Sequence, residues 1–419
     1  MQSDFSNTYS QKHFEAEALV RSREYTKFIK GLRKMTDYTL HEASLFVPGD
    51  TEYQVYIQSS LKPFKNVKHV VLVGIGGSSL GTEAVYHALR TEKTPELHVI
   101  DSIEHDSIQH FSSLIKSTAL NEIAVVILSK SGNTTETVLN ATLVTELLVK
   151  RYGKDAVSRI IYVGNAETPL MKACEARGIL TIAMPEIVGG RYSVFTAVGM
   201  VPLTLLKFDV SAMREGALSA LTDANLKLIE KRAHTLVQHA KNGVHTVNFF
   251  TFTKRLSQIG YWYRQLLAES IGKGKTRAGE PFCNQLNPVV TTSADLHSIA
   301  ELYLGGYKGI YTRFVSMRDA EAGTLPKKHW LTENVPSLLG KKVSAVTSAI
   351  QTGVLSAYRE QKLPYESITL STISPSEVGF LLSSLMCEVM YLGYIFEINP
   401  FEQPSVELYK KHTRTALQK

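Results

Sequence analysis

From about residue 66, short apolar runs alternate with longer amphipathic stretches along the chain. This alternation is typical of βαβ units, in which helices cover both faces of a parallel sheet. It predicts a doubly wound, five-stranded parallel sheet within a first α/β domain over residues 66–205. The apolar runs expected to form its strands are 67–74, 97–101, 123–129, 159–164 and 180–184.

A chain of 419 residues exceeds the usual size of one hydrophobic core, so two domains are expected. Residues 192–210 have the pattern of a helix leading out of the first sheet, and a second alternating region follows from about residue 225. We therefore expect a second αβα domain over residues 206–419 that ends in a C-terminal helix. Residues 1–65 are expected to be a mainly helical segment that packs on the body. The clearest elements of the second domain are a helix at 249–268, strands at 307–317 and 366–372, and a nearly all-apolar helix at 377–396.

Composition indicates which cellular compartment and which class of protein to expect. Hydrophobic residues make up 44% and charged residues 20%, which is typical of a soluble globular protein. The N-terminus has no signal-peptide pattern, and no uninterrupted apolar run approaches the roughly 18 residues that a membrane span needs. Cys174, Cys283 and Cys387 lie far apart and form no CxxC pair, so neither a disulfide framework nor a zinc site is indicated. We expect a cytoplasmic protein.

The formal net charge of +7 raises the question of nucleic-acid binding. No Lys/Arg stripe interleaved with aromatic residues accompanies that charge, so nucleic acid is not the expected partner. Binding of a small anionic substrate explains the positive net charge equally well, and so does a solvated basic surface without a function.

The first candidate binding loop is GIGGSSLG, residues 74–81, which directly follows a predicted strand. Its glycines let the backbone approach a ligand, and the next helix points its N-terminus at that ligand. A dinucleotide-binding turn is the main competitor, because Asp101 ends the next strand where a ribose-binding acid would lie. The dinucleotide fingerprint requires glycine at position 79, where this chain has Ser79. A glycine turn needed only for tight packing is the third interpretation.

A second loop of similar character, SKSGNTTET at residues 129–137, follows the next predicted buried strand. One interpretation is a capping box in which Asn133 caps the helix and Glu136 reaches back. Capping alone does not require the remaining hydroxyl groups and the lysine. Parallel strands end at the same edge of a sheet, so both loops are expected to converge there. Together they predict a site for a phosphate monoester.

With both loops in view, the sequence resembles the glucose-6-phosphate isomerase family. The resemblance spans residues 70–411, and its ordered motifs make chance similarity implausible. It implies two αβα sandwiches of the sugar-isomerase (SIS) type and a homodimer that needs neither metal nor cofactor. It also implies reversible conversion of glucose 6-phosphate to fructose 6-phosphate through a cis-enediol, in glycolysis and gluconeogenesis. The matching motifs are GIGGSSLG, SKSGNTTET, VGGRYSVFTAVG (188–199), AESIGKGK (268–275), TSADLHS (292–298) and NPFEQPSVELYKK (399–411).

Aldose–ketose isomerisation needs a base, a group that stabilises the enediolate oxygen, and a group that opens the sugar ring. By resemblance, Glu269 is the base and Arg191 stabilises the developing charge. His297 matches the ring-opening histidine, which in this family reaches the site from the neighbouring subunit. Lys410 matches a lysine that assists ring opening, and Gln403 lies beside the substrate. Outside these motifs, a single glutamate or histidine would be given no role.

The same resemblance places the phosphosugar. Gly77 and Ser78 would border the sugar, whereas Ser129, Lys130, Ser131 and Thr134 would hold the phosphate. Two features depart from the family pattern. Gly132 and Asn133 replace part of a threonine run, which leaves the individual phosphate contacts open. The interval from Glu269 to His297 is longer, with residues 276–290 between them.

Three alternatives accompany this prediction. A related isomerase would also accept mannose 6-phosphate, which the sequence does not exclude. A non-catalytic phosphosugar sensor would need the loops but not the base, the arginine, the histidine and the lysine together. An NAD-dependent oxidoreductase is least favoured, because Ser79 breaks its fingerprint and the second loop has no use in it.

Overall fold

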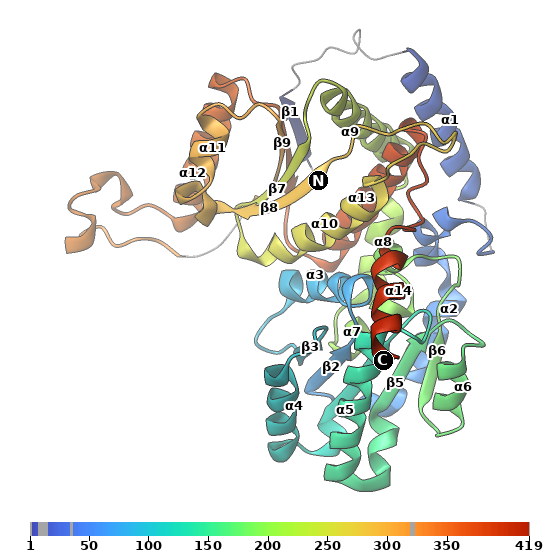
Figure 1. Cartoon of the computed structure of the whole chain (residues 1–419). Helices are drawn as coiled ribbons and strands as arrows, with labels where there is room; N and C mark the ends of the chain where they lie inside the picture. Colours follow the sequence, from blue (N-terminus) through green and yellow to red (C-terminus); the bar gives the residue numbers. More distant parts are fainter. Residues whose placement is uncertain (1, 7–15, 34–36, 319–322, 419) are drawn as a thin grey trace.

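The computed structural model describes residues 2–6, 16–33, 37–318 and 323–418. These residues form two five-stranded sheets, each covered by helices on both faces (Figure 1). The expected fold class, two αβα sandwiches, is confirmed. The expected boundary between residues 205 and 206 falls at the end of helix α7 (Ala197–Leu205) and stays a prediction.

The first sheet is parallel throughout, with the strand order β3-β2-β4-β5-β6. All five predicted strands are present, and each of their bounds lies within two residues of the expected one. The strands are β2 (His69–Val73), β3 (Glu96–Ile100), β4 (Ile123–Leu128), β5 (Ile160–Gly164) and β6 (Leu180–Ala183).

The central strand β4 shows why this sheet could be read from the sequence. All six of its residues are buried, because successive side chains enter the two opposite helical layers. A strand covered on both faces therefore appears as an unbroken apolar run. One layer contains α3 (Leu80–Leu89) and α7, and the other contains α4 (His105–Ser117), α5 (Thr135–Tyr152) and α6 (Pro169–Glu175).

The second sheet has the order β1-β10-β9-β7-β8 and is parallel except for its edge strand β1. Strand β1 pairs with β10 in the antiparallel direction, and it is an element that the prediction of a mainly helical segment over residues 1–65 did not include. The polar sequence of β1 carries no strand pattern and depends on β10 as a template. The strands are β1 (Gln2–Ser6), β7 (Thr246–Thr251), β8 (Asn287–Thr292), β9 (Ile310–Met317) and β10 (Tyr365–Leu370).

Helices cover both faces of the second sheet as well. On one face lie α9 (Asp223–Lys241), α10 (Ser257–Ile271) and α13 (Pro375–Ile395). The other face packs against α11 (Ala300–Leu304) and α12 (Val343–Glu360). The remaining α-helices are α1 (Ala16–Leu32), α2 (Thr51–Ser60), α8 (Val210–Ser219) and α14 (Val406–Leu417).

Two predicted helices were wrong in extent. The helix expected over 249–268 is the end of strand β7 followed by α10. Both faces of β7 are buried, so its apolar run merged with that of the following helix. The helix expected over 192–210 is limited to α7, because residues 190–192 form a tight turn and a second helix, α8, begins at Val210.

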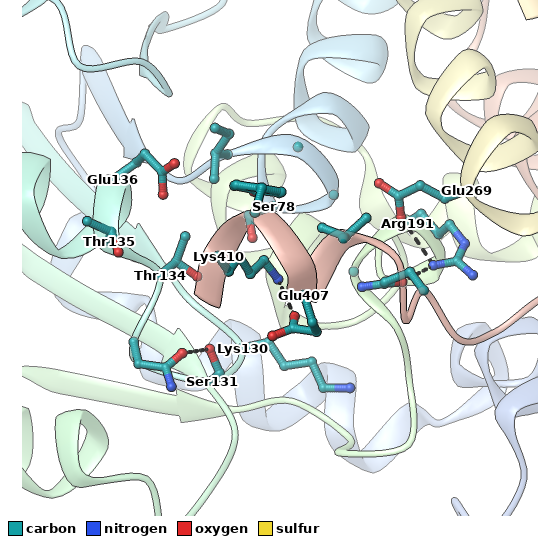
Figure 2. A pocket seen from close by; sticks show the side chains of 18 of the residues that line it. Ser78, Lys130, Ser131, Thr134, Thr135, Glu136, Arg191, Glu269, Glu407 and Lys410 are labelled. Carbon is teal, nitrogen blue, oxygen red and sulfur yellow. Dashed lines mark hydrogen bonds and ion pairs between the residues drawn. The ribbon is translucent and has the colours of Figure 1, made fainter. Parts of the chain in front are cut away.

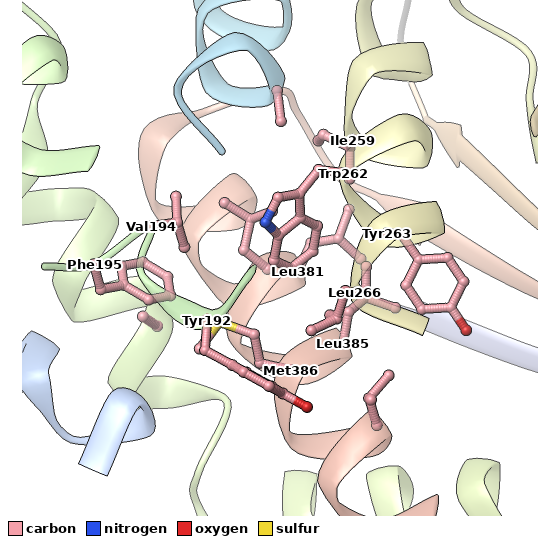
Figure 3. Packing of buried hydrophobic residues seen from close by; sticks show 14 of the residues in the cluster. Tyr192, Val194, Phe195, Ile259, Trp262, Tyr263, Leu266, Leu381, Leu385 and Met386 are labelled. Carbon is pink, nitrogen blue, oxygen red and sulfur yellow. The ribbon is translucent and has the colours of Figure 1, made fainter. Parts of the chain in front are cut away.

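One continuous core joins the two halves of the chain. Trp262 and Leu266 of α10 pack with Leu385 of α13 and with Tyr192 and Phe195 from the segment after the first sheet (Figure 3). Figure 1 shows α10 and α13 between the two sheets. The helix that carries Glu269 is therefore fixed by both domains.

Helix α13 corrects the expectation that no segment is apolar enough for a membrane span. By length and composition it meets that criterion, and it is the only such helix among the described residues. However, 89% of its apolar window is buried inside the protein. Its hydropathy therefore reflects its position in the protein core.

A buried cluster of charges lies beside α10. Arg232 of α9 and Arg313 of β9 form ion pairs with Glu366 of β10 and Glu388 of α13, and all four side chains are at most 1% exposed. The Arg313 guanidinium lies over the Tyr263 ring of α10, 5.0 Å from its centroid. Each arginine pairs with both glutamates, so removing any one side chain would leave one uncompensated charge in the buried cluster, which costs about 3–5 kcal/mol in such sites.

Candidate active site

A cavity of about 500 Å³ opens at the carboxyl edge of the first sheet, where parallel sheets bind ligands. The turns that follow β2 and β4 form one part of its wall. Residues 190–191, α10, the C-terminal helix α14, Asn165 and Gln403 form the rest. The two predicted loops therefore converge as expected, and segments from the second half of the chain complete the cavity.

Close backbone packing explains the glycines of the first loop. A Cβ at Gly77 would lie 2.4 Å from the carbonyl carbon of Gly190 and 2.6 Å from the amide nitrogen of Arg191. The turn at residues 76–78 can therefore lie directly on the segment that carries Arg191. Ser78 also lines the cavity, whereas Asp101 and Ser79 do not. The dinucleotide-binding interpretation gains no support from this arrangement.

Hydroxyl groups and a lysine line the end of the cavity next to α5. Lys130, Ser131, Thr134 and Thr135 all contribute to the wall (Figure 2). Helix α5 begins at Thr135, so the positive end of its dipole faces this part of the cavity. Burial lowers the pKa of Lys130 from its ordinary value, while Glu186 nearby opposes the shift.

The capping interpretation of this loop was wrong. Thr134 occupies the N-cap position of α5, and no side chain accepts a capping hydrogen bond there. Asn133 instead accepts a hydrogen bond from the Ser131 hydroxyl, at 2.5 Å. Gly132 has φ +71°, a left-handed conformation that explains glycine at this departure from the family pattern.

Ser129 lies outside the cavity wall. Its side chain is buried at the end of β4, and its hydroxyl oxygen has no hydrogen-bond partner among the described residues. Its carbonyl accepts a hydrogen bond from the Tyr162 hydroxyl at 2.8 Å. The phosphate contact expected for Ser129 has no support in this geometry.

The opposite end of the cavity contains the expected base. The Glu269 side chain is 29% exposed, and its Oε2 accepts a hydrogen bond from Nη1 of Arg191 at 3.2 Å. Gln265, one helical turn earlier in α10, donates from Nε2 to Glu269 Oε1 at 2.8 Å. Both carboxylate oxygens are therefore oriented. In Figure 2, Glu269 and Arg191 lie on the far side of Lys410 from Thr134 and Thr135.

The Arg191 guanidinium is held by an almost complete set of acceptors and is only 1% exposed. Its Nε donates to the Ser270 hydroxyl at 2.8 Å, and that hydroxyl also bonds the Tyr192 hydroxyl at 2.9 Å. Nη2 donates to the carbonyl oxygens of Pro400 and Glu402, and Nη1 donates to the Gln403 side chain. Arg191 therefore ties α10 to the 400–403 segment and fixes Gln403 in the cavity wall.

Lys273 supports the same corner from outside the cavity wall. Its ammonium donates to the backbone carbonyl of Glu269 at 2.7 Å and to that of Glu402. Burial, followed by the nearby Arg191 charge, lowers the pKa of Lys273 to about 8. This lysine lies in the quoted AESIGKGK motif, but nothing in its spacing predicted the contact.

Helix α14 closes the cavity from the C-terminal side. Lys410 and Arg414 line the cavity as cations, together with Tyr409. The Lys410 ammonium donates to Oε1 of Glu407 at 2.7 Å, within the same helix. The expected ring-opening lysine is thus in the cavity but bound to a carboxylate.

The structure does not bring His297 into this cavity. His297 ends a 3₁₀ turn, Ser293–His297, that directly follows β8, and its side chain is exposed. Asp295 closes that turn with a capping box on Thr292.

Several cavity residues were absent from the predicted set. Gln265 could have been found, because it lies four residues before Glu269 and residues at that spacing share a helix face. Thr135 belongs to the hydroxyl run already noted. Asn165 follows β5 just as the two loops follow β2 and β4. Glu136, Glu407 and Arg414 carry no signal in the sequence that separates them from solvated helix residues.

Comparison with known protein families shows to which family this chain belongs. The family model described as phosphoglucose isomerase matches residues 58–419. The chain belongs to the phosphoglucose isomerase family. The predicted family and the class of enzyme, an isomerase, are confirmed.

Two curated relatives illustrate the similarity. A glucose-6-phosphate isomerase of Streptococcus agalactiae serotype III (strain NEM316) is 30% identical, with 87% of this chain and 83% of that protein covered. A glucose-6-phosphate isomerase of Alkaliphilus metalliredigens (strain QYMF) is 29% identical, with 85% and 81% covered.

Two solved structures have the same fold as this chain. A hypothetical protein of Thermus thermophilus superposes with a TM-score of 0.86 at 27% identity, and covers 99% of this chain and 100% of its own. A glucose-6-phosphate isomerase of Chlamydia trachomatis D/UW-3/Cx gives a TM-score of 0.82 at 18% identity, with 99% and 88% covered.

Proposed function

We propose that this chain interconverts glucose 6-phosphate and fructose 6-phosphate, with Glu269 as the base that moves a proton between C2 and C1. The observation that carries the proposal is the pairing of Glu269 with Arg191 in a cavity whose other end is rich in hydroxyl groups. The curated relatives quoted above carry the name of this activity. The reaction belongs to glycolysis and gluconeogenesis, and we place the enzyme in the cytoplasm.

The phosphate group binds at the N-terminus of α5. Ser131, Thr134 and Thr135 supply hydroxyl donors, and the Lys130 ammonium supplies positive charge. Gly77 and Ser78 border the sugar along the first loop. Anchoring the dianion there directs the other end of an open-chain hexose toward Glu269.

The chemical step centres on two proton transfers at carbon, from C2 to Glu269 and from Glu269 to C1. Glu269 removes the proton from C2 of the aldose, the electrons of that bond form the C1=C2 double bond, and the carbonyl oxygen becomes negatively charged. The Arg191 guanidinium stabilises this enediolate because it keeps its charge and its fixed orientation. The hydroxyl proton of O2 passes to O1, and return of the proton from Glu269 to C1, with a new carbonyl at C2, gives the ketose.

Ring opening precedes that step. Lys410 and Gln403 line the cavity, where Lys410 assists proton transfer to the ring oxygen and Gln403 lies beside the sugar. The exposed position of His297 outside its own cavity is consistent with a homodimer in which His297 of the partner subunit completes the site.

A coupled assay tests the proposed activity. Fructose 6-phosphate is converted to glucose 6-phosphate in the presence of a metal chelator, and glucose 6-phosphate and mannose 6-phosphate are compared side by side as substrates in the reverse direction. We expect turnover of glucose 6-phosphate with the chelator present. A folded protein that gives no product would contradict the proposal.

Complementation tests the shared site. Glu269→Gln and His297→Ala proteins are unfolded together, mixed in equal amounts and refolded. Each mixed dimer then has one intact site, so the mixture should recover about a quarter of wild-type activity if subunits pair at random. Activity no greater than the mean of the two variants would place His297 and Glu269 in the same subunit's site or remove His297 from the mechanism.

A further inference from the structure

A compact group of metal-binding side chains lies at the opposite edge of the first sheet, away from the reaction cavity. His69 is the first residue of β2, Glu96 is the first residue of β3, and His98 follows two positions later. His69 and Glu96 are register partners in this parallel pair. Register partners and residues two apart share a face of the sheet, so all three side chains point to the same side.

The distances between their ligand atoms are short. His69 Nδ1 lies 3.1 Å from His98 Nε2 and 3.4 Å from Glu96 Oε2, and His98 Nε2 lies 3.7 Å from that same oxygen. Nitrogen and oxygen ligands lie about 2.0–2.2 Å from Zn²⁺, so two ligands of a tetrahedral site are about 3.3–3.6 Å apart. The three measured distances bracket that value. An ion at the centre of the triangle would need shifts of only a few tenths of an ångström.

The chemistry of the group also favours a transition metal. Two imidazole nitrogens and one carboxylate oxygen suit Zn²⁺, whereas Ca²⁺ and Mg²⁺ take six or more oxygen ligands. The His69 and His98 side chains are 21% and 10% exposed, and the Glu96 side chain is 60% exposed. The imidazoles are thus held by their surroundings, while the carboxylate remains open to solvent and gives an ion access.

Few other charged or imidazole groups lie close to these three side chains among the described residues. The next imidazole is His110 of α4, whose ring centroid lies 5.4 Å from that of His98, and its side chain is exposed. The neighbouring Lys68 ammonium is paired with Glu122 at 2.5 Å, so its positive charge is compensated. Water can complete the coordination from the solvent side, where the Glu96 side chain is 60% exposed.

We propose that His69, Glu96 and His98 bind one divalent transition-metal ion, best matched by Zn²⁺, that links β2 to β3. The site is distinct from the reaction cavity and takes no part in isomerisation. Because binding requires the folded strand pair, the ion stabilises the first domain.

Calorimetric titration with ZnCl₂ tests the proposal on the full chain after treatment with a chelator and desalting. We expect one equivalent to bind and the melting temperature to rise with zinc concentration. Glu96→Gln should weaken binding at least tenfold, and His98→Asn more strongly. The same changes should leave isomerase activity in chelator at the wild-type level, which also shows that both variants fold.

Two control variants separate this site from incidental zinc binding. His105→Gln alters an exposed histidine at the start of α4, and Cys283→Ser removes the exposed thiol. Both should bind one equivalent with wild-type affinity. The proposal is overturned if the wild type binds no zinc, if Glu96→Gln and His98→Asn bind as tightly as wild type, or if Cys283→Ser abolishes binding.

Discussion

Ser270 offers a test of how Arg191 is positioned, because it contacts the arginine and not the cavity. Its hydroxyl accepts a hydrogen bond from Arg191 Nε and bonds the Tyr192 hydroxyl, at 2.8 and 2.9 Å, in a fully buried setting. Ser270→Ala leaves the guanidinium donor unpaired, while the contacts of Arg191 with Pro400, Glu402 and Gln403 remain. The arginine therefore stays in place but loses one of the bonds that fix its orientation.

An unpaired buried donor costs about 1–3 kcal/mol. If this cost falls on the transition state, where Arg191 faces the enediolate, kcat should decrease about 5- to 150-fold. The KM for fructose 6-phosphate should stay within about twofold, because the phosphate contacts lie at the other end of the cavity. Steady-state kinetics in the coupled assay would measure both quantities.

Ser384 of α13 provides the matched control. It is also fully buried, but its hydroxyl has no hydrogen-bond partner among the described residues. Ser384→Ala should leave kcat unchanged. If Ser270→Ala keeps wild-type kcat, or if the two variants lose activity equally, the Ser270 contact does not position the arginine.

Two further predictions concern the same corner of the site. The Lys273 pKa of about 8 predicts that kcat declines above about pH 8, as the ammonium beside Glu269 loses its proton and positive charge is lost near the enediolate. Lys273→Arg should move this decline to higher pH, and a pH–kcat profile unchanged by the substitution would refute the assignment. Gly77→Ala places a Cβ 2.4 Å from backbone, so Arg191 must shift and kcat/KM should decrease at least tenfold, with a stability loss of about 1–3 kcal/mol. Gly274→Ala, where a Cβ meets nothing within 4 Å, should behave as wild type in both kinetics and thermal unfolding.

The parts of the fold that the sequence predicted share one physical property. Strands β2 to β6 are short apolar segments separated by amphipathic helices, so local pattern alone defines them. Strand β7 was missed because its buried aromatic residues run on into α10. Strand β1 was missed because it exists only through pairing with β10, which lies over 350 residues away in the sequence.

The candidate site also has parts that the sequence could predict and parts that it could not. Loops that follow a recognisable strand, such as residues 130–135, could be placed at the edge of the sheet from the sequence alone. Contacts made by distant segments could not, and Ser129 shows the limit: its position one residue before Lys130 turns its side chain into the protein. The five acceptors around Arg191 come from α10 and the 400–403 segment, and their convergence depends on tertiary packing.

Proton exchange at C2 tests the central claim most directly. Glucose 6-phosphate deuterated at C2 is incubated with the Glu269→Gln enzyme, and loss of the label to solvent is followed by NMR. We predict that exchange slows by about 10²–10⁴-fold while substrate affinity stays within a few-fold of wild type. Glu136→Gln, which alters another carboxylate in the cavity wall, should keep exchange near the wild-type rate. Exchange at the wild-type rate in Glu269→Gln would show that the base is a different residue.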